Sequence, residues 1–109
     1  MILSEKIKNK LLLIKDKPKM VFSGDYNFYV LKLFMMGYMN GLGDAYSIDL
    51  NKEITDWYGK EEGVLLSVFV GDYIEDKYSY LAEEELKNKL IMIYVDFFLE
   101  NADFFNIEK

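Results

Sequence analysis

Residues 81–101 read LAEEELKNKLIMIYVDFFLEN, and this stretch decides the fold class. Its apolar residues recur at steps of four, three and four, the spacing of one face of an α-helix, at Leu86, Leu90, Ile93 and Phe97. Glu83-Glu84-Glu85 opens the stretch, where negative charge favours the positive end of the helix dipole. We therefore expect a helix over about 81–101, with Ser79 as its cap.

The N-terminal stretch has a pattern of the same type. Apolar residues at steps of four, four and three predict an amphipathic helix over residues 3–15, with its stripe at Leu3, Ile7, Leu11 and Ile14. Asp16-Lys17-Pro18 should end it, because the residue before a proline is pushed out of the helical region. Residues 16–24 are then expected to be a loop, with capping side chains for the next helix in Ser23-Gly24-Asp25.

The next helix is expected over about 26–42 and is apolar on two sides. One stripe is Phe28, Leu31, Met35, Tyr38 and Leu42, and the other is Tyr26, Val30, Leu33 and Gly37. A helix that is apolar nearly all round is normally covered by others, so we expect this one to be central. Gly37 and Gly41 stand four apart and indicate close helix approach within the fold, and Gly41 and Gly43 are expected to end the helix.

Residues 49–58 predict a short helix with Leu50, Ile54 and Trp57 on one face, followed by a turn over 59–63. The run 64–70 has the composition of a strand but no partner strand, so we expect a buried helical turn or a helix running toward Ile74. The predicted fold is all-α: a compact bundle of about four to five helices in a single domain, residues 1–109, with a short strand near 64–70 as the alternative.

Composition excludes several kinds of chemistry. The 109 residues contain no Cys and no His, which removes disulfides, Cys or His zinc sites, thiolate nucleophiles and the usual general base. The formal charge is −6, and all thirteen basic residues are Lys. Without Arg and with an acidic balance, nucleic-acid binding is disfavoured. We expect no enzyme activity and no cofactor.

Charge and hydropathy also bear on location. Residues 1–40 have a balance of +4, whereas residues 41–109 have a balance of −10, which predicts an acidic face on the later part of the chain. Lysines interrupt the apolar residues of the N-terminus, so no signal peptide is expected. The most apolar window, 28–39, contains Lys32 and is too short to span a bilayer. These features predict a cytoplasmic protein that does not enter the membrane.

Two groups of carboxylates resemble metal or catalytic sites. Asp72, Glu75 and Asp76 would share a helix face and could hold Mg²⁺ or Ca²⁺ or supply an acid/base pair. Charge runs are ordinarily surface features, so we interpret these residues as a solvated acidic face. The run from Asp49 to Glu53 begins like a calcium loop but continues with Ile54 and Lys60 where the loop needs Gly and Glu. We therefore predict no metal site.

Aromatic and acidic residues occur together in the second half of the chain. Tyr and Trp dominate binding hot spots, and acidic neighbours would attract a basic partner. The competing interpretation is that Trp57 and most of the tyrosines lie in the core. We predict a partner-binding surface made of Tyr46, Asp49, Glu53, Asp56, Tyr58, Glu61, Glu62, Asp72, Glu75 and Asp76.

The order of these features resembles small bacterial immunity proteins that are encoded beside polymorphic or contact-dependent-inhibition toxins. The resemblance is carried by a short helix, Lys17-Pro18-Lys19-Met20 with Gly24 behind it, a helix ending in Phe34-x-x-Gly37-Tyr38, Trp57, and a terminal helix with Phe97-Phe98. Lys17 and Val21-Phe22 stand where an arginine and an aromatic-glycine turn would be more typical. The resemblance implies an all-helical inhibitor that masks a toxin domain, and it carries over no catalytic residue.

The expected function is thus an immunity protein that binds and neutralises a cognate toxin, a nuclease domain with a basic cleft. An acidic, tyrosine-rich surface would complement such a cleft. One alternative is an acidic helical adaptor or phage-type regulator with a different protein partner. Another is a metal enzyme that uses only carboxylates. A homodimer through the aromatic residues is also compatible with the sequence.

Overall fold

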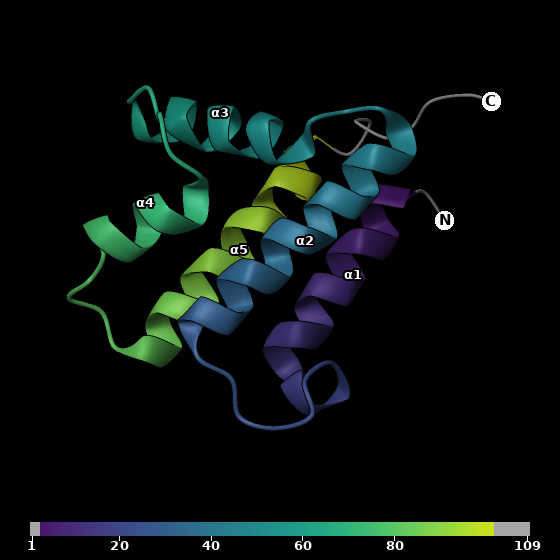
Figure 1. The fold of residues 1–109 in the computed structure, drawn as a ribbon, viewed down its shortest axis with the longest axis vertical. Helices are drawn as coiled ribbons and strands as arrows, with labels where there is room; N and C mark the ends of the chain where they lie inside the picture. The colour runs from purple at the N-terminus through teal and green to yellow at the C-terminus, as the bar shows by residue number, and fades with distance from the viewer. Residues whose placement is uncertain (1–2, 102–109) are drawn as a thin grey trace. The chain divides into compact units, whose positions relative to one another are not determined.

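The computed structural model describes residues 3–101 and contains five α-helices and one short 3₁₀ helix within them (Figure 1). These are α1 Leu3–Asp16, η1 Pro18–Met20, α2 Phe28–Tyr46, α3 Leu50–Glu62, α4 Val70–Lys77 and α5 Glu83–Glu100. The all-α prediction is confirmed. No strand occurs in residues 3–101, so the alternative of a strand near 64–70 is wrong. The predicted loop over 16–24 contains the 3₁₀ turn, which has Pro18 at its first position.

The chain divides into two units, residues 1–25 with 91–109 and residues 26–90. Helix α5 is continuous and contributes to both units, and the expectation of a single domain stays a prediction. In the first unit the predicted stripe of α1 is buried at Ile7, Leu11 and Ile14. The second half of α5 supplies the other large buried side chains of this unit, Ile91, Ile93, Tyr94, Val95, Phe97 and Phe98.

Helix α2 begins the second unit and buries one face rather than two. Its core residues are Phe28, Leu31, Met35 and Met39. The second predicted stripe is wrong, because Val30 and Leu33 are more than two fifths exposed and Gly37 is exposed as well. Nothing lies within 4 Å of where a Cβ would stand at Gly37 or at Gly41, so the close approach predicted there does not occur.

Close approach occurs instead at Gly43, in a helix that continues beyond the expected end. Helix α2 runs to Tyr46 and ends at Ser47, whose φ of 57° is left-handed. The chain then turns back across α2, and the Ile48 N–H donates to the Gly43 carbonyl at 2.8 Å. A Cβ at Gly43 would overlap the Ile48 carbonyl oxygen. This residue therefore permits the crossing and does not end the helix.

The residues that cap α2 and α5 differ from those that the sequence predicted. Asn27, rather than 23–25, caps α2 through a hydrogen bond that its side chain accepts from the Val30 N–H at 2.9 Å. Helix α5 begins four residues after Ser79, and the Glu85 side chain accepts from the Ala82 N–H at 3.1 Å. Both helices therefore begin a few residues later in the chain than the sequence predicted.

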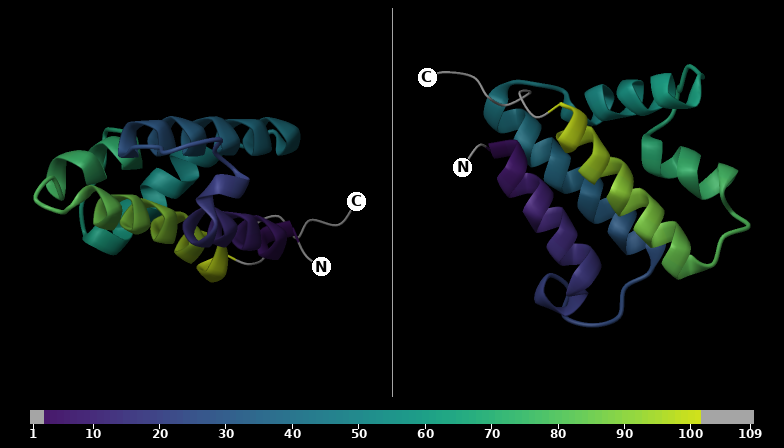
Figure 2. Two further views of the ribbon diagram at one scale, coloured as in Figure 1. Left: turned by 90° about the horizontal axis from the view of Figure 1, so that it is seen from below. Right: turned by 180° about the vertical axis from the view of Figure 1, so that it is seen from behind.

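Helix α3 is longer than predicted, and the segment after it has no regular structure. Residues 59–62 belong to α3, so only Gly63, with a φ of 74°, remains of the predicted turn. Residues 64–69 form a loop that leads from α3 to α4, as Figure 2 shows, and are neither helical nor fully buried. The predicted helix toward Ile74 exists, but it begins at Val70.

Candidate functional site

Helix α3 carries the first group of predicted site residues. Asp49 caps it by accepting from the Lys52 N–H at 3.3 Å and is exposed. Glu53 and Glu61 are exposed, and Asp56 is partly exposed. The helix packs against α2, where the Asn51 side chain donates to the Met36 carbonyl at 3.1 Å. The structure thus brings several carboxylates to the outer surface of one helix, as the sequence predicted.

Four of the ten predicted site residues form ion pairs with lysines. Lys52 pairs with Asp56 at 2.8 Å, and Lys77 pairs with Glu62 at 2.6 Å. Lys32 of α2 pairs at 2.7 Å with two residues of α4, Asp72 and Glu75. Asp76 is exposed on α4 and takes part in none of these pairs. Asp72, Glu75 and Glu62 therefore help to position α4, which limits what they can offer to a partner.

Lys32 holds two of these carboxylates, Asp72 and Glu75, against α2. Its aliphatic stem is buried against Gly71, while its ammonium lies between two carboxylates that are about half exposed. Burial by itself would lower the pKa of Lys32, but the hydrogen bonds to Asp72 and Glu75 outweigh it and raise that pKa. The cluster that could have held a divalent metal ion is thus organised around a lysine.

Tyr58 does not belong to the surface. Only 6 % of this residue is exposed, so it is a core side chain and cannot serve as the anchor that the sequence suggested. Burial, with a further contribution from Glu62, raises the pKa of its hydroxyl. Tyr46 and Trp57 are partly buried. Tyr80, which was not among the predicted site residues, is far more exposed, at 77 %.

Three tyrosines, Tyr58, Tyr73 and Tyr78, cluster around Glu62. Tyr58 and Tyr73 meet edge to face at 6.1 Å between ring centroids. The Lys77 ammonium lies 5.5 Å from the Tyr73 ring and 5.4 Å from the Tyr78 ring. Its hydrogen bond lowers the pKa of Glu62. This part of the predicted surface therefore stabilises the contact between α3 and α4.

The structure reveals an exposed apolar loop that sequence reasoning missed. Leu65 is 96 % exposed, and Val64 and Val68 are nearly half exposed. The loop is fastened to α3 at both ends: the Val64 N–H donates to the Gly59 carbonyl at 2.9 Å, and the Val70 N–H donates to the Thr55 hydroxyl at 3.3 Å. The signal in the sequence was an apolar run without a partner strand, directly after an acidic helix.

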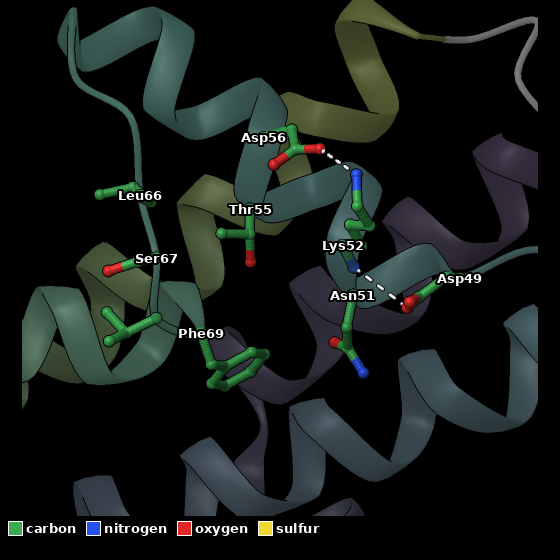
Figure 3. Close-up of a pocket in the computed structure, with 9 residues that line it drawn as sticks. Asp49, Asn51, Lys52, Thr55, Asp56, Leu66, Ser67 and Phe69 are labelled. Atoms are coloured by element: carbon green, nitrogen blue, oxygen red, sulfur yellow. Dashed lines mark hydrogen bonds and ion pairs between the residues drawn. The ribbon is translucent and has the colours of Figure 1, made fainter.

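An open groove of about 310 Å³ lies between this loop and α3 (Figure 3). Its residues are Asp49, Asn51, Lys52, Thr55, Asp56, Leu66, Ser67, Val68 and Phe69. Figure 3 shows the loop residues on one side and the α3 residues on the other, with Lys52 bonded to both aspartates. Two predicted site residues, Asp49 and Asp56, thus meet an apolar surface that was not predicted.

Net charge separates the two units. Residues 26–90 hold twelve Asp and Glu against six Lys and so account for the whole formal charge of −6. The other residues hold seven of each and are balanced. The unit that contains α3 and the exposed loop is therefore the acidic one.

Within residues 3–101, no three His, Cys, Asp or Glu side chains converge as a metal site would require. None of the helices in this same range has the length and apolar character needed to cross a bilayer.

Comparison with protein-family models, with curated proteins and with solved structures finds no match for this chain.

Proposed function

We propose that this protein is an immunity protein, which binds a cognate bacterial toxin and neutralises it without catalysis. The observation that carries the proposal is the position of the fully exposed Leu65 beside the acidic helix α3, in the unit that holds all of the net negative charge. Exposed apolar side chains surrounded by charged residues are typical of protein-binding surfaces.

The two components of this surface serve different steps of binding. Carboxylates attract a basic partner over distance and raise the association rate. The apolar loop loses contact with water when the partner docks, which slows dissociation. The surface comprises Asp49, Glu53, Asp56 and Glu61 with the loop residues 64–68, and excludes Tyr58 because that ring is buried.

A toxin with a basic nucleic-acid cleft is the partner that this surface fits best. Nucleases bind phosphates with clustered Lys and Arg, and an acidic protein that covers those residues competes directly with the nucleic acid. The protein would act in the cytoplasm, where a nuclease meets its substrate. Inhibition needs only occupation of the cleft, so no catalytic group is required of the inhibitor.

The test uses the product of the neighbouring gene as the candidate toxin. We expect co-expression of the two proteins to restore growth and to yield a complex by size-exclusion chromatography. Leu65→Asp should abolish complex formation, whereas Leu99→Asp should not, because Leu99 is also exposed (54 %) but lies on α5 in the first unit.

Two outcomes would contradict the proposal. If the neighbouring product does not bind, the toxin partner is wrong, and an acidic adaptor with another partner takes its place. If it binds equally well to the Leu65→Asp variant, the interface lies elsewhere on the protein.

A further inference from the structure

The groove between α3 and the loop combines two properties that one side chain of a partner could satisfy together. Leu66, Val68 and Phe69 make the loop side apolar. Asp49 and Asp56 place carboxylates on the helix side. A purely apolar ligand would cover the carboxylates without pairing them, which costs free energy. A bare cation would gain nothing from the apolar side of the groove.

The groove is built in advance of binding. Gly59 lets the loop lie close to α3, because a Cβ there would stand 2.7 Å from the Val64 carbonyl oxygen. The hydrogen bonds at Gly59 and Thr55 hold the two ends of the loop. A ligand therefore does not have to order this segment, which lowers the entropic cost of binding.

Asp56 is already paired with Lys52, but a cationic ligand can displace this lysine. The Lys52–Asp56 pair joins positions i and i+4 of one helix, and both side chains are exposed, at 68 % and 44 %. Exposed helix pairs of this kind are weak. A cation that also buries an apolar stem in the groove would replace Lys52 at a net gain.

We propose that the groove receives an arginine side chain of the partner protein. The three methylenes of the arginine lie along Leu66, Val68 and Phe69, and the guanidinium donates to Asp56, while Asp49 adds negative charge on the helix side. Arginine fits better than lysine because its planar group offers several donors at once and stacks on aromatic rings such as Phe69. This inference rests on the proposed function, since it names the chemistry by which a basic toxin would be held.

The experiment titrates the ¹⁵N-labelled protein with N-acetyl-arginine amide and follows the backbone amides by NMR. The neutral isostere N-acetyl-citrulline amide is the matched ligand control. We expect the arginine probe to shift amides of residues 49–56 and 66–69 and the citrulline probe to bind about tenfold more weakly. Asp56→Asn should weaken arginine binding by a similar factor.

Glu53→Gln is the matched protein control, because it removes the same charge from α3 at a residue that does not line the groove. It should leave the dissociation constant within about twofold of the wild type. Shifts spread evenly over all acidic residues, or equal effects of Asp56→Asn and Glu53→Gln, would overturn the proposal.

The result separates this inference from the proposed function. If the toxin binds but the arginine probe gives no localised shifts, the groove inference is wrong and the function stands. If the probe binds in the groove but the neighbouring gene product does not bind the protein, the groove is confirmed and the toxin is excluded as its partner.

Discussion

Gly43 and Gly37 lie on the same helix, six residues apart, and have opposite surroundings. The chain after α2 crosses over Gly43, whereas the space around Gly37 is open. Side-chain size is therefore restricted at one glycine and unrestricted at the other. A pattern of small residues alone does not distinguish them, since both stand in an apolar stretch of one helix.

Substitution by alanine should separate the two positions. Gly43→Ala should destabilise the protein by about 1–3 kcal/mol, because the new Cβ overlaps the Ile48 carbonyl oxygen. Gly37→Ala should stabilise it by up to about 1 kcal/mol, since alanine favours the helix over glycine. Urea unfolding of both variants measures the difference. A loss of stability in Gly37→Ala would show that this face of α2 is covered.

At acidic pH the free energy of unfolding depends on the protonation of Glu62. Lys77 holds the folded pKa of Glu62 below its ordinary value of 4.5, so the folded state binds this proton more weakly than the unfolded chain. The contribution is therefore complete above pH 4.5 and is lost as the pH falls through the lowered folded value. Glu62→Gln should be less stable than the wild type at pH 7, and the two should converge toward pH 3.

Urea unfolding at pH 7, 4.5 and 3 measures this convergence. Glu61→Gln is the control, because the neighbouring Glu61 is exposed and joins no ion pair within the described range 3–101. A stability difference between Glu62→Gln and wild type that stays constant over this pH range would show that the Lys77 contact does not form.

Among the helices, α4 shows how one side chain attaches a short helix to its neighbour α2. It has eight residues and no side-chain cap. Its attachment to α2 comes from Lys32, which has a buried stem under Gly71 and two carboxylate partners on α4. Most of the stabilisation should come from the stem, because the carboxylates are about half exposed and their ion pairs are screened by water.

Two substitutions at Lys32 test which part matters. Lys32→Met keeps most of the stem and removes the charge, whereas Lys32→Ala removes both. We expect Lys32→Ala to be less stable than Lys32→Met by about 1–2 kcal/mol, from roughly 0.8 kcal/mol per buried methylene. Hydrogen exchange of residues 70–77 should rise in the alanine variant. Equal stability of the two variants would assign the attachment of α4 to the ion pairs instead.

At the scale of the whole molecule, the charge of −6 belongs to residues 26–90, while the remaining residues are neutral in sum. Long-range attraction of a basic partner should therefore depend on acids of this unit and hardly on acids elsewhere. Glu53, Glu61 and Asp76 are the most informative of them, because they are exposed and take part in neither the caps nor the ion pairs described above.

Association with the toxin should slow steeply as salt is added, since attraction is screened beyond roughly 8–10 Å at physiological ionic strength. Changing Glu53, Glu61 and Asp76 to Lys should slow association further and flatten the salt dependence. The matched control changes Glu5, Asp25 and Asp96 of the first unit, which are exposed as well. Stopped-flow kinetics at two salt concentrations measure the association rates of the wild type and of the two triple variants. Equal effects of the two triple variants would mean that only total charge matters.

The helical class and much of the core follow from periodicity along the chain. Periodicity identified the buried faces of α1 and α5, because residues three and four apart always share a helix face. The charge pattern also predicted that the acidic residues of α3 and α4 lie at the surface, since an unpaired carboxylate stays near water in almost any fold.

Tertiary structure alone decided which apolar residues stay exposed and which acids are already paired. Val30 and Leu33 are exposed although their spacing suggested burial, and Leu65 projects from a loop where the sequence predicted a buried helical turn or helix. Asp72 and Glu75 face Lys32, forty and forty-three residues away in the chain. The groove likewise joins residues 49–56 to residues 66–69. Periodicity describes one helix at a time, whereas these features depend on which segment packs against it.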